Sequence, residues 1–326
     1  MRIEIWADVV CPWAYIGKRR LERALAAPET AGLEAEVVWR PFRIDPTAPA
    51  RAVPLEEALR DPLMDGALAR CAPGLTPAEN RARVSAIAAE EGLGPPWGAA
   101  WRASSHDAHR LLALALDHGG AALQNEVAEQ VMKAHFVEGL DISDRSRLKA
   151  VAERAGFPEG GPLLDTDAAE RAVRESLLVG KARGIATSPT FVVGDRALAG
   201  AQAPETIAEF LTAGDRPRRA LPEEVERLRY AESLLDRRDP LGALELLRPL
   251  LDEHGRDTGV RLLAARAYFA SAQLRRARET LEELVAESPD DSYARLLLGR
   301  TLQRQGLADE AAVHLRLATT MSPGYA

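Results

Sequence analysis

The order of apolar and polar residues predicts two strands separated by a helix at the start of the chain. Residues 2–6 are mostly apolar and β-prone, residues 8–12 interrupt the pattern, and residues 13–25 continue with helical spacing. Residues 33–39 then alternate apolar and acidic positions, as a half-buried strand does, and Pro41 ends that run. We therefore expect Cys11 to lie where the first strand passes into the first helix.

Between Pro54 and about Arg183 the pattern becomes almost continuously helical. Thr76 is predicted to be a helix N-cap, with Pro77 at the first helical position and Glu79 as the acid of a capping box. Glycine- and proline-rich breaks separate the predicted helices. We expect these helices at residues 76–91, 105–117, 121–136, 143–155 and 167–180. Together they predict a helical insertion at about residues 54–183.

Strand spacing returns at residues 184–193, where Pro189 stands just before an apolar β-prone run. Gly194 and Asp195 are typical of a tight hairpin turn, and residues 196–199 form the predicted partner strand. A helix to Leu211 follows. Strands on both sides of a helical insertion predict an α/β fold for residues 1–213.

The last third of the chain repeats with a period of 34 residues. Small residues and leucines keep the same register in each period: Ala231, Ala265 and Gly299; Ala243, Ala277 and Ala311; Leu247, Leu281 and Leu315; and Pro289 with Pro323. Small residues at fixed positions let helices pack closely in pairs, which is typical of tetratricopeptide repeats. We expect an all-α domain of such repeats at residues 222–326. A polar, breaker-rich linker at residues 214–221 is predicted to join it to the first domain.

Composition and charge narrow the class of protein. A hydrophobic content of 46% with 28% charged residues is typical of a soluble globular chain, and a net charge of −7 disfavours nucleic acid as the main partner. No apolar run approaches the roughly 18 residues that span a bilayer, and no export leader precedes the first strand. Cys11 and Cys71 are the only cysteines, which excludes a disulfide scaffold and fits a reducing compartment. We expect a cytoplasmic protein without a membrane partner, a bound cofactor or a metal.

Cys11 is the candidate nucleophile. At a helix N-terminus, unpaired backbone N–H groups and the helix dipole favour a thiolate, and they lower a cysteine pKa from about 8.5 to between about 3.5 and 7.5. The alternative is that a lone cysteine is a small buried hydrophobic residue. The entry of Pro12 into the helix directly after Cys11 favours the functional interpretation.

Several motifs in chain order resemble one family. The stretches D-V-V-C-P-W and Y-I-G-K at residues 8–18, W-R-P-F at 39–42, A-H-R-L at 108–111 and A-H-F-V-E-G-L-D-I-S-D at 134–144 carry the resemblance. They are similar to the FrnE-like branch of the DsbA family, which are thioredoxin-fold thiol:disulfide oxidoreductases. The resemblance covers residues 1–213 and implies a thioredoxin-like fold with Cys11, Pro12 and Trp13 in the active-site motif. It also implies a cis bond before Pro189, packed against Cys11, with the backbone of Ser188 able to pair with substrate.

One departure from the family changes the expected chemistry. The usual C-P-W-C motif is C-P-W-A here, because Ala14 occupies the position of the second cysteine. A mixed disulfide on Cys11 would then need an external thiol such as glutathione to resolve it. Ser188 also departs from the apolar residue that is more common before the proline.

Three functions stay open from the sequence. The first is a monothiol thiol-disulfide oxidoreductase acting on a disulfide or thiol substrate, which could be a protein. The second is a glutathione-dependent isomerase or transferase, because relatives of this branch include 2-hydroxychromene-2-carboxylate isomerases. The third is a redox-inactive adaptor that binds a protein partner through the repeats.

Three further residues have reactive side chains but are not assigned to the active site. His109 and His135 lie on predicted helices, where a histidine is more often packed or hydrogen-bonded than catalytic. Cys71 could in principle replace the missing thiol, but nothing in the sequence places it near Cys11.

Overall fold

The computed structural model describes residues 1–61, 72–213 and 221–325. It divides into two compact units, and each is described separately. The first holds residues 1–180 and the segment from Ile185 to the end of helix α9 (Pro204–Thr212). The second holds residues 181–184 and the helices from α10 (Glu223–Asp236) onward. Apart from Leu221, the predicted linker lies outside the described residues.

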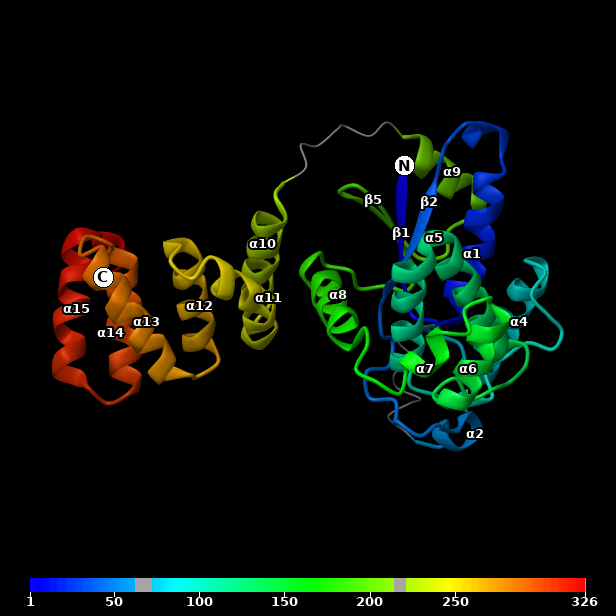
Figure 1. Ribbon diagram of the computed structural model, residues 1–326, viewed down its shortest axis with the longest axis horizontal. Coiled ribbons are helices and arrows are strands. Elements are labelled where there is room, and N and C mark those ends of the chain that lie inside the picture. Colours follow the sequence, from blue (N-terminus) through cyan, green and yellow to red (C-terminus); the bar gives the residue numbers. More distant parts are fainter. Residues whose placement is uncertain (62–71, 214–220, 326) are drawn as a thin grey trace. The chain divides into compact units, whose positions relative to one another are not determined.

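A four-stranded sheet forms the centre of the first unit. Its strand order is β2 (Glu36–Pro41), β1 (Arg2–Ala7), β5 (Thr190–Val193) and β6 (Arg196–Ala199). Strand β1 pairs in parallel with β2 and antiparallel with β5, and β5 pairs antiparallel with β6. Figure 1 shows β1 and β2 beside each other, next to the helices of the unit. This sheet with a long helical insertion confirms the predicted α/β architecture of the first unit.

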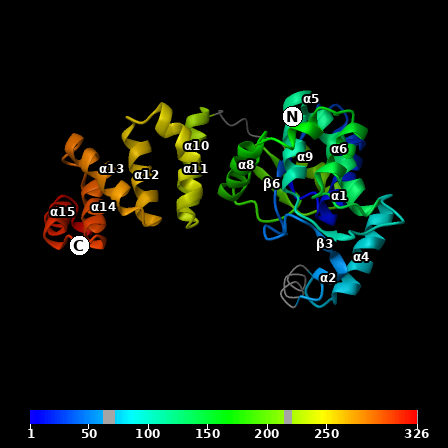
Figure 2. The ribbon, with the colours of Figure 1, turned by 60° about the horizontal axis from the view of Figure 1, so that its bottom comes forward.

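The helices of the insertion follow the predicted breaks. They are α2 (Leu55–Ala58), α4 (Pro77–Glu90), α5 (His106–Phe136), α6 (Arg145–Arg154), α7 (Gly160–Leu163) and α8 (Glu170–Ala182). Thr76 caps α4 through the predicted capping box with Glu79. Helix α5 joins two predicted helices, but Gly119 and Gly120 have non-helical backbone angles at the predicted break. A two-residue pairing of β3 (Val53–Pro54) with β4 (Trp101–Arg102) was not predicted, and Figure 2 shows β3, α2 and α4 at one end of the unit.

Helix α5 closes the open edge of the sheet. Strand β2 is an edge strand, so its outer backbone groups have no neighbouring strand to bond. The buried amide of Gln124 replaces that neighbour at one residue: its oxygen accepts from Trp39 N–H at 2.8 Å and its nitrogen donates to Trp39 C=O at 3.0 Å. This pair fixes the middle of α5 against the sheet.

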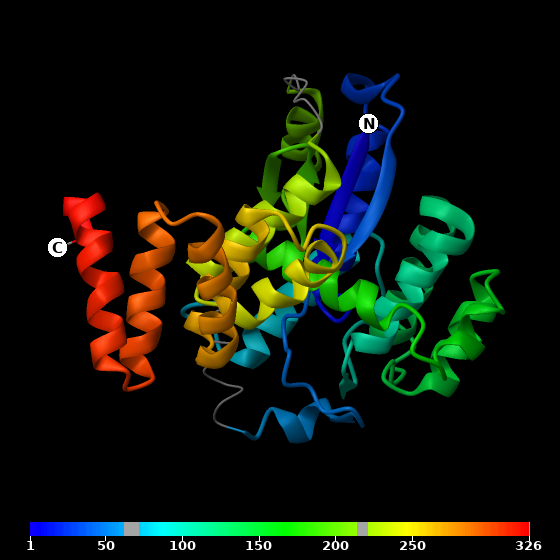
Figure 3. The same cartoon turned by 60° about the vertical axis from the view of Figure 1, so that its left-hand side comes forward.

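The second unit is built from antiparallel helix pairs. After α10 come α11 (Pro240–Glu253), α12 (Thr258–Ala270), α13 (Leu274–Glu287), α14 (Ser292–Arg304) and α15 (Ala308–Met321), and Figure 3 shows α14 and α15, orange to red, side by side. The small residues of the 34-residue register are buried between helices. At Gly299 a Cβ atom would lie 2.7 Å from Leu315 Cγ, so only glycine lets α14 approach α15 this closely.

Candidate functional site

Cys11 lies at the end of the sheet, where β1 passes into α1 (Pro12–Leu25). It is the N-cap residue of α1, and Pro12 occupies the first helical position, as predicted. The Cys11 N–H donates to Asp8 C=O at 2.9 Å, and the Ala14 N–H donates to Cys11 C=O at 2.9 Å. These bonds tie the cysteine to both the strand and the first helical turn. Cys11 is a free thiol.

The prediction of a lowered pKa for Cys11 is wrong. The residue is only 5% exposed, and burial raises the pKa of its thiol to about 11. Hydrogen bonding from the Ser188 side chain and from the backbone N–H groups of Ala14 and Trp13 favours the thiolate, while the negative charge of Asp8 disfavours it. The N-terminal position was predicted correctly, but the loss of water around the sulfur outweighs its effect. The resting side chain is therefore a thiol at neutral pH.

Ser188 and Pro189 lie beside Cys11, although they are distant from it in the sequence. The Ser188–Pro189 bond is cis, which confirms what the family resemblance implied. The Cys11 thiol donates to Ser188 C=O at 3.4 Å, and both residues are buried. Gly17 makes this approach possible, because a Cβ atom there would lie 2.9 Å from Pro189 Cγ. The structure thus brings Cys11, Ser188 and Pro189 together, and their roles in chemistry stay predictions.

Two positions were candidates for a second thiol, and Trp13 lies between the first of them and Cys11. Ala14 is fully buried in the first turn of α1, where its methyl group belongs to the hydrophobic core. Cys71 lies outside the described residues, so the prediction that it does not replace the missing thiol stays untested. Trp13 is half-buried beside Cys11, and its ring packs against the core.

Asp8 is a site residue that the sequence analysis missed. Its carboxylate is 1% exposed and accepts from the N–H groups of Val10 at 3.4 Å and Ile44 at 2.8 Å. Its own N–H donates to Ser188 Oγ at 2.9 Å. One residue therefore connects the cysteine loop, the segment after β2 and the proline loop. An acid directly after a buried strand and three residues before Cys11 was the available signal.

Two buried histidines belong to the same region. His109 Nε2 donates to Phe42 C=O at 3.0 Å and lies 3.4 Å from Asp8 Oδ1. Burial lowers the pKa of His135 to about 4, against an opposing influence of Asp8, so this ring is neutral at neutral pH. Its Nδ1 is buried without a hydrogen-bond partner. Both histidines are packed inside the domain, as predicted for structural residues, although His109 touches a residue that also bonds Ser188.

The Y-I-G-K motif positions α1 through charge pairing. Tyr15 OH donates to Glu129 Oε1 of α5 at 2.6 Å, and Lys18 Nζ lies 2.8 Å from Glu129 Oε2. Burial alone would raise the pKa of Glu129, but hydrogen bonding and charge attraction from Lys18 hold it below its ordinary value. With Gly17 against Pro189, this motif therefore sets the direction of α1 and hence the place of Cys11.

Within residues 1–61, 72–213 and 221–325, no group of three or more His, Cys, Asp or Glu side chains could hold a metal ion. In the same ranges no helix is long and apolar enough to cross a bilayer.

Comparison with known proteins decides the family. The model of the DSBA-like thioredoxin domain matches residues 2–212. This chain belongs to the DSBA-like thioredoxin domain family. A probable DsbA oxidoreductase from Streptomyces coelicolor is 30% identical with a TM-score of 0.56, and the match covers 68% of this chain and 94% of that one.

Two further similar proteins have lower sequence identity to this chain. YwbO of Bacillus subtilis, an uncharacterized protein, is 22% identical over 219 residues, which cover 65% of this chain and 96% of that protein. A 2-hydroxychromene-2-carboxylate isomerase structure is 14% identical with a TM-score of 0.46, covering 65% of this chain and 94% of that chain.

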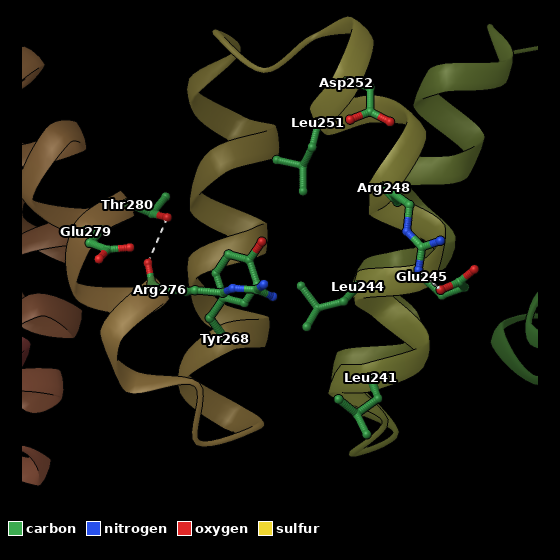
Figure 4. A pocket seen from close by; sticks show the side chains of 10 residues that line it. All are labelled: Leu241, Leu244, Glu245, Arg248, Leu251, Asp252, Tyr268, Arg276, Glu279 and Thr280. Carbon is green, nitrogen blue, oxygen red and sulfur yellow. Dashed lines mark hydrogen bonds and ion pairs between the residues drawn. The ribbon is translucent and has the colours of Figure 1, made fainter.

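The DSBA-like domain is followed by a region that matches a second family model. The tetratricopeptide repeat model matches residues 234–301, which fall inside the region where the 34-residue period predicted such repeats. A groove of about 700 Å³ lies between α11, α12 and α13 (Figure 4). Leu244 and Leu251 of α11 face Tyr268 across it, and Arg276 lies over the Tyr268 ring at 5.8 Å.

Proposed function

We propose that this protein is a cytoplasmic thiol-disulfide oxidoreductase that works with one nucleophilic cysteine, Cys11. The observation that carries the proposal is the contact between the Cys11 thiol and the carbonyl of Ser188, beside Pro189, at the N-terminus of α1. Membership of the DSBA-like family supports the reaction class. The presence of only two cysteines supports a reducing compartment.

The reaction follows from the side chains present. After loss of its proton to a base in solution, Cys11 attacks one sulfur of a substrate disulfide, forming a mixed disulfide and releasing the other half as a thiolate. Ala14 carries no sulfur, so the motif cannot resolve this species internally. An external thiolate, for which we propose glutathione, then attacks the substrate sulfur and releases Cys11 as a thiolate. The two steps exchange disulfides without net oxidation.

The test is to follow the cysteine itself. Protein purified under acid trapping should carry a small-thiol or protein adduct on the Cys11 peptide by mass spectrometry. The purified protein should also form a glutathione adduct with glutathione disulfide, and the Cys11→Ser variant should lose both. Turnover of a small aromatic substrate with glutathione, without any adduct, would favour the isomerase or transferase alternative. If Cys11→Ser changes no adduct, partner or phenotype, the adaptor alternative is favoured.

We also propose that the repeats bind a protein segment. The groove supports this proposal, because two of its lining residues, Leu241 and Leu244, are apolar. The equivalent positions of the next repeat, 34 residues later, are Arg275 and Arg278. Leu241 is 65% exposed, whereas Arg278 is paired with Glu282 and Glu310. Of these two repeats, only the first offers an exposed apolar side chain to a partner at this position.

Site-specific crosslinking tests the proposed groove. A photoreactive residue at Leu241 should capture a protein partner in cells. The same residue at Val313, which is exposed but outside the groove, should capture less. Equal capture at both positions would contradict the groove as the binding site.

A further inference from the structure

An unpaired guanidinium group lies against the active-site motif. Helix α4 packs on α1, and Arg83 of α4 stands over the Trp13 ring with its Cζ 5.7 Å from the ring centroid. Its Nη2 donates to the neutral Asn80 side chain, at Oδ1, across 3.3 Å. Arg83 is exposed, and within the described part of the chain no carboxylate forms an ion pair with it. Trp13 belongs to the same C-P-W-A motif as Cys11, so Arg83 contacts the segment that carries the thiol.

A second such group follows β2. Arg43 lies between Phe42 and Ile44, whose backbone groups are bonded to His109 and Asp8. The same Asp8 carboxylate also accepts from the N–H of Val10, the residue before Cys11. The Asp8 side chain therefore holds together the backbone next to Arg43 and the backbone next to Cys11. Strands β1 and β2 are parallel, and both segments leave the sheet at its carboxyl edge, where α/β proteins bind ligands.

Among residues 1–61, 72–213 and 221–325, no carboxylate forms an ion pair with Arg43. In the described part of the chain its Nε is buried without a hydrogen-bond partner, and its Nη2 donates to Pro46 C=O at 3.4 Å. The adjacent carboxylate of Asp45 is already held by Arg102 and by Thr47, each at 2.7 Å. A half-buried cation without a counter-charge is unfavourable until an anion binds.

We propose that Arg83 and Arg43 recognise the carboxylates of an anionic small disulfide or thiol and guide it to Cys11. This inference rests on the proposed exchange reaction and adds the class of molecule that enters it. Two planar guanidinium groups suit a partner with two or more carboxylates, because each can make paired hydrogen bonds to one of them. The reaction is the exchange described above: the Cys11–sulfur bond forms, the substrate disulfide breaks, and one anionic thiolate leaves.

The experiment compares three disulfides that differ in charge. Glutathione disulfide is anionic, 2-hydroxyethyl disulfide is neutral and cystamine is cationic. Initial rates of adduct formation on the Cys11 peptide of the full-length protein are measured at one pH by mass spectrometry. The variants are Arg83→Gln, Arg43→Gln and the charge-keeping Arg83→Lys. Arg51→Gln, which removes an exposed arginine from the same segment before β3, is the matched control.

We expect the wild type to favour glutathione disulfide over cystamine, and this preference should weaken as salt is added. Each glutamine variant should lower the glutathione disulfide rate roughly three- to tenfold, with the neutral rate within about twofold of wild type. Arg83→Lys should keep most of the preference, and Arg51→Gln should keep all of it.

Two kinds of failure can be distinguished. If the wild type forms adducts with all three disulfides and neither glutamine variant changes the ratio of anionic to neutral rates, the recognition role is wrong and the exchange reaction stands. If no disulfide forms an adduct on wild-type Cys11, the proposed function fails and the inference fails with it.

Discussion

The backbone N–H of Asp8 donates to the hydroxyl of Ser188 across 2.9 Å, although the two residues are 180 positions apart in the chain. Both are buried, so neither group can exchange this bond for water. The bond joins the loop that carries Cys11 to the loop that carries Pro189. It therefore fixes the distance between the thiol and the carbonyl that faces it.

Removing the Ser188 hydroxyl should destabilise the protein. In Ser188→Ala the buried Asp8 N–H is left without its acceptor, and we expect a loss of about 1–3 kcal/mol in the free energy of unfolding. Urea unfolding followed by tryptophan fluorescence measures this. Ser146→Ala, at an exposed serine, should change stability by less than about 0.5 kcal/mol. Equal stabilities for the two variants would show that the Asp8–Ser188 bond contributes little.

The alkylation rate of Cys11 should depend steeply on pH. Burial raises its pKa to about 11, so the thiolate fraction, and with it the rate with iodoacetamide, should rise about tenfold per pH unit between pH 7 and 10. Folding favours the thiol, so this contribution to stability is present below the ordinary cysteine pKa and is lost as the pH rises through 11. In urea the same cysteine should level off near its ordinary pKa of about 8.5. A plateau below pH 9 in the folded protein would contradict the burial argument.

Restoring the second cysteine should convert the site to a dithiol. Ala14 is one helical turn from Cys11, which fits the Cα separation of about 4.4–6.8 Å that a disulfide needs. After mild oxidation, Ala14→Cys should lose two titratable thiols and should reduce insulin faster than wild type. Ala24→Cys, also buried in α1 but about three and a half turns from Cys11, should lose none. Retention of both thiols in Ala14→Cys would show that the inferred geometry of the first turn is wrong.

His135 should make stability fall in mild acid. Its folded pKa of about 4 is below its ordinary value of about 6.5, so its contribution is present above pH 6.5 and is lost as the pH falls toward 4. Between pH 7.5 and 5 the wild type should lose about 2 kcal/mol through this residue, by linkage to the shifted pKa. His135→Gln should show a correspondingly smaller loss in urea unfolding at the two pH values. An unchanged pH dependence in that variant would exclude His135 as its source.

The local signals of the sequence predicted most of the fold. Strand β6 coincides with its predicted residues 196–199, and Thr76 caps α4 as its motif indicated. The period of 34 residues placed the repeat helices because each contacts mainly its neighbours in the chain. The β3–β4 pair was missed, since two residues per strand leave no alternation to detect.

The candidate site was predicted in position but not in electrostatics. Cys11 and Pro189 could be found because strand and helix signals, together with the family motifs, mark them locally. The burial of Cys11 and the role of Asp8 could not, because they depend on contacts with Ser188 and His109 from distant parts of the chain. Desolvation is a property of the packed domain, and no short stretch of sequence records it.

The strand order also determines when the thiol becomes protected during synthesis. Strand β1 is made long before its partner β5, which pairs with it so that Ile5 lies opposite Phe191. Until Ser188 has emerged from the ribosome, Cys11 has an incomplete sheet beside it and remains open to water, with the reactivity of an ordinary cysteine. The repeats need only neighbouring helices and can assemble quickly, whereas this sheet must wait for its distant strand. Cys11 is thus most vulnerable to oxidants in the nascent chain, and the arrival of β5 ends that period.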